Sequence, residues 1–390
     1  MDFNNTHIAF QSKSDKDLNR AYWLFKIIGY PTIVKIGKSL TNVAIKSKLP
    51  IEGIIRKTIF KQFCGGTTIN DCEQTTADLY KFGIGTILDY SVEGKTSNED
   101  FEKTTNEIIA TILKAKGNVA IPFAVFKVTG ISRFGLLEKG NEIDSKLTDQ
   151  EQLELTDVIN RIDRICKAGF ENNVPVFIDA EESWIQDIID RISVSMMEKY
   201  NKNHAIIFNT IQMYRHDRLS FLENAINHAR NNNYHYGIKL VRGAYMEKER
   251  ERSLKMGYPS PIQQDKSHTD TDYNKALELI LENISVLALC AGTHNEDSSK
   301  LLANLIHKMN LNKEDKRIYF AQLLGMSDHI SYNLSSEKYN VAKYVPYGPV
   351  EEVLPYLLRR ADENTSVAGQ TSRELSLLTS EKNRRKNEKK

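Results

Sequence analysis

An alternation of apolar runs with longer helical stretches constrains the fold of this chain more than any other feature. Each run is rich in β-branched and aromatic residues, and it is followed by polar residues and then by a helical pattern. This order is typical of parallel strands that are buried on both faces and connected by helices. Seven such runs cover residues 118–130, 174–183, 205–214, 236–245, 285–295, 318–326 and 340–349.

The number of these strand–helix units favours a closed barrel. A weaker eighth run lies near residues 261–264, and eight units within about 250 residues fit a (β/α)8 barrel better than an open sheet. Gly83 and Gly85 in "FGIGTIL" lack the third glycine of a dinucleotide-binding motif, which argues against a Rossmann domain. We therefore predict an α/β fold with the barrel over residues 118–378.

The segments before and after the predicted barrel show different sequence patterns. Residues 1–117 show apolar side chains at spacings of three and four, as in Ile51, Ile54 and Ile55, which predict an N-terminal helical arm. Residues 379–390 are dominated by the basic run "EKNRRKNEKK", which predicts a disordered tail.

Composition and cysteine usage narrow the class of protein. A formal net charge of +2 gives no electrostatic basis for binding nucleic acid. The four cysteines form no CxxC pair, which fits reduced thiols in the cytoplasm better than disulfides or a zinc site. The most apolar early stretch, residues 21–37, is interrupted by Lys26, Pro31 and Lys35, so it predicts a core or interfacial helix rather than a membrane span.

Polar residues interrupt or close most of the predicted strands. Catalytic residues of (β/α)8 barrels gather at the C-terminal ends of the strands. Any one of these residues on its own could simply cap the next helix, but their recurrence on several strands predicts a functional site. In chain order they are Lys127, Asp179, Gln212, Tyr214, Arg242 to Tyr245, Thr293, His294, Asn295 and Tyr344.

The residues alone leave two other kinds of site open. Asp179, Glu181 and Glu182 in "FIDAEES" could bind a metal together with His294, although acidic residues after a strand also suit a helix N-terminus. Lys127 within an apolar strand could instead form a Schiff base, as in barrel aldolases, if burial lowered its pKa.

Several stretches together resemble the proline dehydrogenase family in its single-function form. They occur in the family's order between about residue 118 and residue 366, and "KLVRGAY" and "YLLRRADEN" are the most specific. The helical first 117 residues resemble the family's longer form through "FCGGTTINDC" and "LDYSVEGK". The other matching stretches are "FKVTG", "FIDAEES", "TIQMY", "GTHN", "QLLGMSD" and "YVPYGP".

The resemblance implies a fold and an activity. The family fold is a distorted (β/α)8 barrel whose last helix lies over the barrel mouth. The family reaction oxidises L-proline to Δ1-pyrroline-5-carboxylate by hydride transfer to FAD, and a membrane quinone reoxidises the flavin. Two alternatives are another barrel flavoenzyme, related to methylenetetrahydrofolate reductase, and a Schiff-base aldolase that uses Lys127.

The resemblance also implies which residues bind the substrate. Arg359 and Arg360 in "YLLRRADEN" would bind the proline carboxylate, since a planar guanidinium matches a carboxylate bidentately. Lys127 would be a third cation, and Glu363 would hold the arginines. The other implied substrate residues are Tyr245, Leu323 and Tyr344, which pack on the ring, and Asp179, which orients it.

A further set of residues is implied to bind FAD. Gln212 would lie at the isoalloxazine edge, and Gly243 would let the backbone approach the cofactor closely. The remaining implied cofactor residues are Lys239, Val241, Lys266, Thr293, His294 and Arg360, and the resemblance implies no metal.

The family's partners give the last expectations. They are L-proline, a membrane quinone, and a separate pyrroline-5-carboxylate dehydrogenase, because nothing in the chain resembles the aldehyde dehydrogenase module fused to some relatives. Quinone use implies a cytoplasmic protein that is peripherally associated with the inner membrane. The basic tail and the helix around residues 23–36 are the candidate membrane surfaces.

Overall fold

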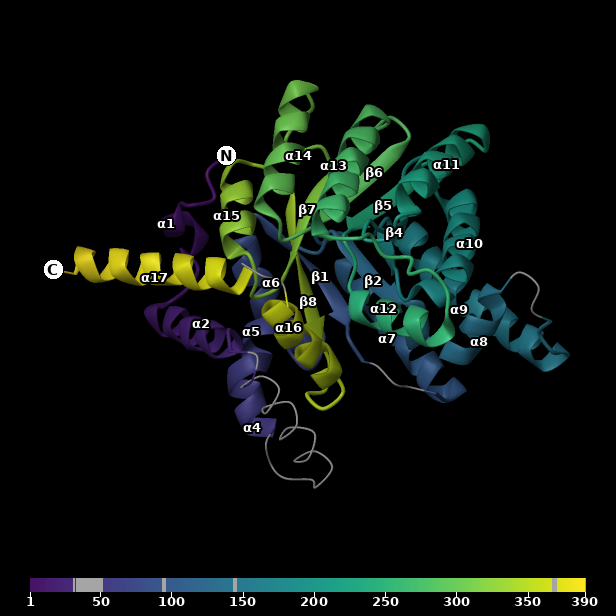
Figure 1. The fold of residues 1–390 in the computed structure, drawn as a ribbon, viewed down its shortest axis with the longest axis horizontal. Coiled ribbons are helices and arrows are strands. Elements are labelled where there is room, and N and C mark those ends of the chain that lie inside the picture. The colour runs from purple at the N-terminus through teal and green to yellow at the C-terminus, as the bar shows by residue number, and fades with distance from the viewer. Residues whose placement is uncertain (31, 33–51, 93–95, 143–145, 367–369, 390) are drawn as a thin grey trace. The chain divides into compact units, whose positions relative to one another are not determined.

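Eight parallel strands form a closed barrel in the order β1 to β8 (Figure 1). The computed structural model describes residues 1–30, 32, 52–92, 96–142, 146–366 and 370–389. The closed barrel of eight strands confirms the prediction of a (β/α)8 fold. The strands are β1 (Ile84–Tyr90), β2 (Phe123–Lys127), β3 (Val176–Asp179), β4 (Ile207–Gln212), β5 (Tyr236–Val241), β6 (Leu287–Gly292), β7 (Ile318–Leu323) and β8 (Val341–Tyr347).

Helices connect successive strands, precede β1 and follow β8. The connecting helices are α7 (Asn98–Ala115), α8 (Phe134–Asn141), α9 (Asp149–Asn172), α10 (Ser183–Tyr200), α11 (Arg218–Asn231), α12 (Met246–Met256), α13 (Lys266–Glu282), α14 (Glu296–Lys308) and α15 (Asp328–Ser336), together with the short η3 (Val128–Gly130). The others are α1 (Thr6–Ala9), α2 (Asp15–Ile28), α4 (Glu52–Ile55), η1 (Arg56–Phe60), α5 (Lys61–Phe63), η2 (Asn70–Cys72), α6 (Glu73–Tyr80), α16 (Leu354–Ser366) and α17 (Gln370–Glu388).

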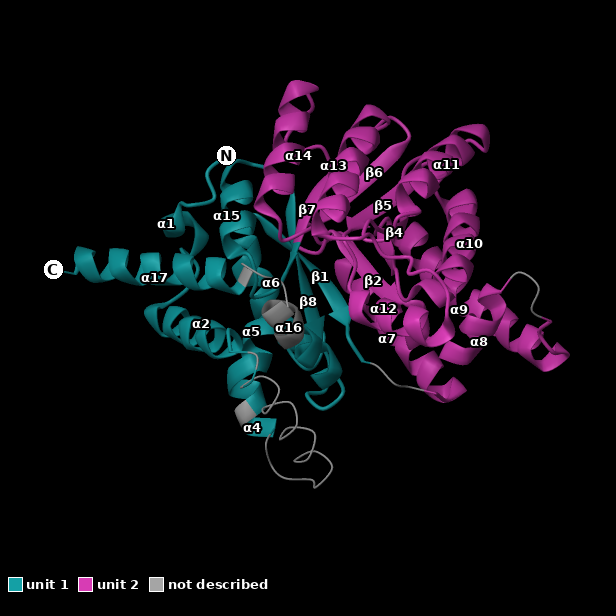
Figure 2. Cartoon of the chain, viewed as in Figure 1, with its two compact units in different colours: residues 1–93, 322–390 teal, residues 94–321 magenta. Residues whose placement is uncertain are grey.

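The chain divides into two compact units (Figure 2). Unit 1 joins both chain ends, residues 1–93 and 322–390, and unit 2 consists of residues 94–321. The domain limits at residues 117 and 378 stay a prediction. Within the expected helical arm, β1 pairs along its whole length with β8.

Two strand predictions need correction. β1 was not predicted as a strand, yet it pairs with β8 so that Ile87 lies opposite Tyr344. The weak run at residues 261–264 forms no named strand and contributes a single bridge between Ile262 and Arg215. In both places the presence of a partner strand, rather than the local apolar pattern, decides the structure.

Unit 2 separates aromatic packing from charge along its strands. Phe123, Phe177 and Phe208, which lie in the N-terminal halves of β2, β3 and β4, pack ring against ring with centroids 4.4 to 5.8 Å apart. Further along, the parallel register places Lys127 of β2 opposite Asp179 of β3. Lys127 and Asp179 thus lie at strand ends, as the sequence predicted, whereas Lys239 lies within β5.

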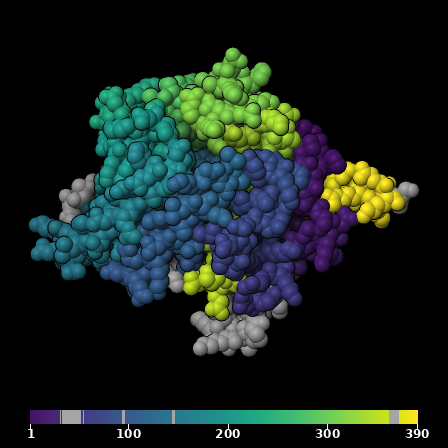
Figure 3. Space-filling view, turned by 180° about the vertical axis from the view of Figure 1, so that it is seen from behind, coloured from purple at the N-terminus to yellow at the C-terminus, as the bar shows by residue number. Residues whose placement is uncertain are grey.

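In unit 1 the two chain ends pack on each other. Helix α2 buries Leu18, Ala21 and Phe25 on one face, and Leu377 and Leu378 of α17 join the same apolar cluster. The N-terminal segments and the C-terminal helix lie side by side in both views (Figures 1 and 3).

The C-terminal residues differ from the disordered tail that was predicted for residues 379–390. Helix α17 continues to Glu388, and Arg385 and Lys389 have partners that lie elsewhere in the chain. Arg385 donates to the backbone oxygen of Phe10 and to Asp15, at 2.9 Å each, and pairs with Glu381 at 2.7 Å. These ion pairs offset the repulsion between like charges that the sequence suggested.

Candidate functional site

Three charged side chains, from the ends of β2 and β3 and from within β5, meet in unit 2. Asp179 accepts from the Nζ of Lys127 at 3.0 Å with one carboxylate oxygen, and from the Nζ of Lys239 at 2.5 Å with the other. Burial raises the pKa of Asp179, but the two ammonium groups outweigh burial and hold this pKa below its usual range. The cluster carries a net charge of about +1, which favours an anionic ligand.

Lys127 is the more exposed of the two cations in this cluster. Its side chain is 25% exposed, whereas those of Lys239 and Asp179 are 10% and 9% exposed. Lys239 is therefore a buried counter-ion of Asp179, while the side chain of Lys127 is partly exposed.

Glu181 links three of the predicted strand ends. Its carboxylate accepts from the backbone N–H of Thr129 at 3.0 Å and from the Thr129 hydroxyl, just beyond Lys127 on β2. Its backbone oxygen accepts from the side chain of Gln212 at 2.7 Å. Burial is the main cause that raises the pKa of Glu181 to about 7. Sequence reasoning considered this residue only as a possible metal ligand.

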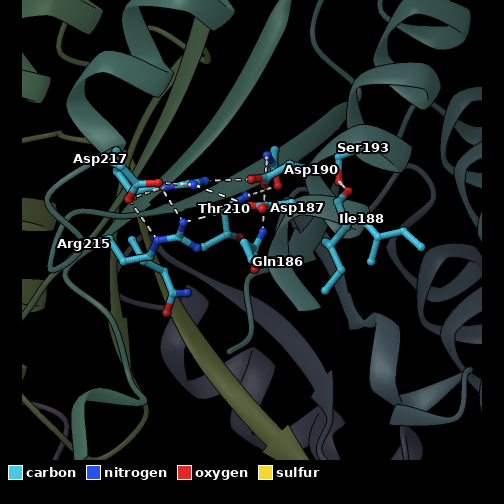
Figure 4. A network of polar contacts seen from close by, with 12 residues as sticks. Gln186, Asp187, Ile188, Asp190, Ser193, Thr210, Arg215 and Asp217 are labelled. Carbon is cyan, nitrogen blue, oxygen red and sulfur yellow. Dashed lines mark hydrogen bonds and ion pairs between the residues drawn. The ribbon is translucent and has the colours of Figure 1, made fainter. Parts of the chain in front are cut away.

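A network of buried polar side chains holds the backbone of Glu181 in place (Figure 4). Gln186 accepts from the backbone N–H of Glu181 and donates to Asp190, both at 2.8 Å. Asp190 also accepts from Asn209 of β4 at 2.8 Å and pairs with Arg218 at 2.7 Å. The loop that carries Glu181 is thus fixed to α10, β4 and α11, so the Gln212 side chain has a rigid acceptor.

Arg242 joins the predicted cofactor residues at the ends of β5 and β6. It donates to the Thr293 hydroxyl at 2.7 Å, to Ser298 at 2.9 Å and to Asp270 at 2.7 Å. Asp270 also pairs with Lys266. The structure therefore brings Thr293 and Lys266 into one network. Sequence reasoning noted Arg242 at a strand end but gave it no role.

Gly243 lies in a backbone conformation that favours glycine, with φ of +136°. A Cβ added there would lie 2.4 to 2.5 Å from ring atoms of Tyr214, so the tyrosine itself explains the glycine. The buried hydroxyl of Tyr214 has no hydrogen-bond partner among the residues that the structure describes.

The residues of this region fit a cofactor with anionic phosphates. Arg242 and Lys266 share the single carboxylate of Asp270, which leaves one positive charge in excess beside the ion pair of Lys239 with Asp179. Thr293 and the Tyr214 hydroxyl add polar groups at the same ends. Val241 and His294, which were predicted to contact the cofactor, are half-buried close by in the chain.

Of the remaining predicted substrate residues, Tyr245 lies in unit 2, where it precedes α12 and its ring faces the Nζ of Lys248 at 5.5 Å, and the others lie in unit 1. Tyr344 is buried on β8, and its backbone oxygen accepts from the N–H of Leu324 at 2.8 Å. Arg359 and Arg360 lie on α16, where the Arg360 guanidinium is buried and stacks over the ring of Tyr356, 5.0 Å from its centroid.

Two further predictions concern Glu363 and metal ligands. Glu363 lies on α16, but its side chain falls outside the described residues. Across the described part of the chain, no group of three or more His, Cys, Asp or Glu side chains is placed to hold a metal ion.

The sequence profile of one family matches most of this chain. The profile described as proline dehydrogenase aligns with residues 72–373, a range that contains every predicted substrate and cofactor residue. The chain belongs to the proline dehydrogenase family.

Individual relatives agree with this assignment. Proline dehydrogenase 1 of Dictyostelium discoideum is 34% identical, over 98% of this chain and 74% of its own length. The human proline dehydrogenase 1 is 40% identical, over 60% of this chain but only 40% of its own length. A hydroxyproline dehydrogenase of Xenopus laevis is 29% identical over 97% of this chain and 89% of its own length.

Solved structures show the same fold. Proline utilization A from Bdellovibrio bacteriovorus, inactivated by N-propargylglycine, superposes with a TM-score of 0.72 at 19% sequence identity. The match covers 93% of this chain and 38% of that protein, so this chain spans well under half of the larger protein.

Proposed function

We propose that this chain oxidises L-proline to Δ1-pyrroline-5-carboxylate with FAD as the hydride acceptor. The observation that carries the proposal is the family match over residues 72–373, together with the charged cluster of Lys127, Asp179 and Lys239 within that range. An ammonium group that is paired with a carboxylate is not the neutral amine that a Schiff-base aldolase needs, which argues against that alternative.

Lys127 would bind the substrate carboxylate. The partial exposure of its side chain and the net positive charge of its cluster support this role. We propose carboxylate binding for Arg359 and Arg360 as well, on the basis of the family motif that they form and the bidentate geometry of guanidinium groups. Glu363 is proposed to hold the two arginines.

Apolar and aromatic side chains would fix the substrate ring. We propose that Tyr245, Leu323 and Tyr344 pack on it and exclude water, so that the reacting carbon is held in one orientation. Asp179 would act through the two lysines, because its carboxylate fixes both ammonium groups. When bound, FAD supplies the two-electron acceptor.

Residues at the ends of β4, β5 and β6 would hold the cofactor. Gln212, whose amide N–H donates to the backbone of Glu181, would present its remaining amide groups to the isoalloxazine edge. Lys266 and Thr293 would bind the phosphate and ribityl parts through the network centred on Arg242. The other residues proposed for FAD are Lys239, Val241, Gly243, His294 and Arg360.

An anaerobic absorbance spectrum tests this proposal. Purified protein should show a flavin band at about 450 nm that L-proline bleaches, whereas D-proline and NADH leave it unchanged. A flavoprotein that stays oxidised with L-proline but is bleached by NADH would point to the reductase alternative. Protein without flavin, and unable to bind added FAD, would refute the proposal.

Hydroxyproline is a second candidate substrate. The similarity to the Xenopus laevis hydroxyproline dehydrogenase over nearly the whole chain favours it. The bulk of Tyr344, if this side chain packs on the ring, favours proline instead. The ratio of kcat/KM for L-proline and trans-4-hydroxy-L-proline decides between them, and the variant Tyr344→Ser should shift that ratio toward hydroxyproline.

We further propose that a membrane quinone reoxidises the flavin, that the protein is cytoplasmic and contacts the inner membrane peripherally, and that a separate pyrroline-5-carboxylate dehydrogenase uses the product. Trp23 and Ile27 lie four apart near the end of α2, Tyr30 follows just beyond it, and the three are 56%, 48% and 54% exposed. Lys26 lies over the Trp23 ring at 4.9 Å, a pairing suited to an anionic lipid interface.

Part of the predicted membrane surface, residues 31 and 33–36, lies outside the described residues. Within the described residues, no helix has both the length and the apolarity to cross a membrane. Sedimentation with anionic vesicles, with and without L-proline, tests the contact. Binding that is unchanged in Trp23→Ala/Ile27→Ala would rule out this surface.

A further inference from the structure

The loop between β7 and α15 has a strained backbone. It runs from Leu323 to Asp328, and both Gly325 (φ of +76°) and Ser327 (φ of +51°) lie in the left-handed region. Serine at positive φ is disfavoured, so surrounding contacts must hold it there. No other residue fits at position 325, because a Cβ there would lie 2.1 Å from the backbone oxygen of Gln62.

Residues far away in the sequence hold this loop through its backbone. The N–H of Ser327 donates to the carboxylate of Glu374 on α17 at 2.5 Å. The side chain of Gln62 on α5 donates to the oxygen of Gly325 at 2.9 Å. One contact thus comes from each of the two sequence segments that form unit 1, and together they fix the two residues that have positive φ.

Lys343 of β8 provides a third set of contacts to the loop. Its Nζ donates to the backbone oxygen of Met326 at 2.5 Å and to the carboxylate of Asp328 at 2.9 Å, and lies 3.3 Å from the oxygen of Leu323. The other oxygen of Asp328 pairs with Lys13, 2.9 Å away. All of these contacts lie within unit 1.

The charges of this cluster are buried. Lys343 and Asp328 have side chains that are 0% and 9% exposed, and that of Glu374 is 4% exposed. Burial raises the pKa of Asp328, but Lys13 and Lys343 outweigh it and hold this pKa far below its usual range. Buried ion pairs can add little net stability. Here they fix the conformation of the loop, because Lys343 binds both the backbone oxygen of Met326 and the carboxylate of Asp328.

The loop begins at a residue that is assigned to the substrate ring. Leu323 packs against the apolar cluster formed by the two chain ends and α16, the helix that carries Arg359 and Arg360. Tyr344 directly follows Lys343, and its backbone oxygen binds Leu324. A displacement of the loop would therefore move the side chain of Leu323 and pull on the backbone of Tyr344.

We propose that Glu374, although it lies at the start of the C-terminal helix, is a positioning residue for substrate recognition, because it holds the Leu323–Asp328 loop in the conformation that shapes the wall around the proline ring. The proposal rests on the proposed function for its substrate part. It assigns to the C-terminal helix a role in ring-size selection that acts through the Ser327 amide.

The test compares two glutamates of the same helix. Glu374→Ala removes the acceptor for Ser327, whereas Glu374→Gln retains a side-chain oxygen that can accept the same bond. Glu381→Gln is the matched control, because Glu381 is equally buried on α17 but pairs with Arg384 and Arg385 instead of the loop.

Two readouts separate positioning from a general loss of stability. In Glu374→Ala we expect KM for L-proline to rise about tenfold and the preference for proline over the six-membered pipecolate to fall, with flavin content unchanged. Amide exchange of residues 322–328 should accelerate in the same variant. Glu374→Gln should restore both values toward wild type, and Glu381→Gln should change neither.

Each outcome has a definite meaning. If Glu374→Ala folds, and ring preference and loop exchange match those of Glu381→Gln, the proposal is refuted. If wild-type protein binds flavin but does not oxidise proline, the proposed function fails together with the substrate part of this inference. In that event the exchange measurement still decides whether Glu374 holds the loop.

Discussion

The buried carboxyl of Glu181 makes a specific prediction about stability and pH. Its pKa is raised to about 7 in the folded protein, mainly by burial, from an ordinary value of 4.5. The folded state therefore binds this proton more tightly than the unfolded state. The resulting stabilisation is complete below the unfolded pKa and is lost as the pH rises through the folded pKa.

The size of the effect follows from the shift. A difference of about 2.5 pKa units corresponds to about 3 kcal/mol, most of it lost between pH 5 and pH 8. The variant Glu181→Gln does not titrate, but it can still accept from the N–H of Thr129 and donate to the Thr129 hydroxyl. Its stability relative to wild type should therefore rise by about 2 to 3 kcal/mol over this pH range.

Urea unfolding at four pH values between 5 and 8, followed by far-UV circular dichroism, measures this difference. Glu223→Gln on the exposed face of α11 is the control, and its unfolding free energy should parallel that of wild type at each pH. A difference between wild type and Glu181→Gln that stays constant with pH would refute the reasoning, since it would mean that Glu181 is ionised throughout.

Three further substitutions test the site. Asp179→Ala leaves the ammonium groups of Lys127 and Lys239 without their shared carboxylate and should cost about 3 to 5 kcal/mol of unfolding free energy; unchanged urea stability would contradict the ion-pair geometry. Gly243→Ala forces a Cβ into the Tyr214 ring, so purified protein should show less absorbance at about 450 nm per chain, and a full flavin content would argue against the packing described. Lys127→Met should raise KM for L-proline by about 30- to 100-fold with flavin content retained, and a wild-type KM would remove Lys127 from carboxylate binding.

The strand pattern of unit 2 was largely predictable from the sequence because its strands are apolar runs separated by clear helices. The strand β1 was not. Its seven residues include Gly85 and Asp89, and they lie between helical segments, so the run is neither continuously apolar nor alternating. It is nevertheless buried almost throughout, since β8 supplies its hydrogen bonds.

The site shows a similar limit. Residue type and position at strand ends were enough to single out Lys127, Asp179 and Gln212, because parallel strands bring their ends together. The hydrogen bonds among them depend on residues that look ordinary in the sequence, such as Thr129, and on the side-chain conformation of Glu181. A glutamate after a strand carries no sign of burial until the neighbouring strands are in place.

The C-terminal basic run illustrates why local charge misleads. Considered alone, the run predicts a solvated and disordered segment. Its actual partners, Asp15 and the backbone of Phe10, lie more than 350 residues away in the sequence. No local pattern contains that information, and the packing of Leu377 and Leu378 into the apolar cluster is seen only in the folded structure.

Unit 1 is built from both ends of the chain, and this has a consequence for its folding during synthesis on the ribosome. The partner strand of β1 is β8, which emerges only after roughly 250 further residues have been translated, on the order of 10 to 50 seconds later. During that interval the first 93 residues cannot complete their unit, and the apolar faces of α2 and β1 remain without their native cover. Nascent chains that stall before residue 341 should therefore need a chaperone, and expression should respond more strongly to slowed translation of the C-terminal third than to changes at the start of the message.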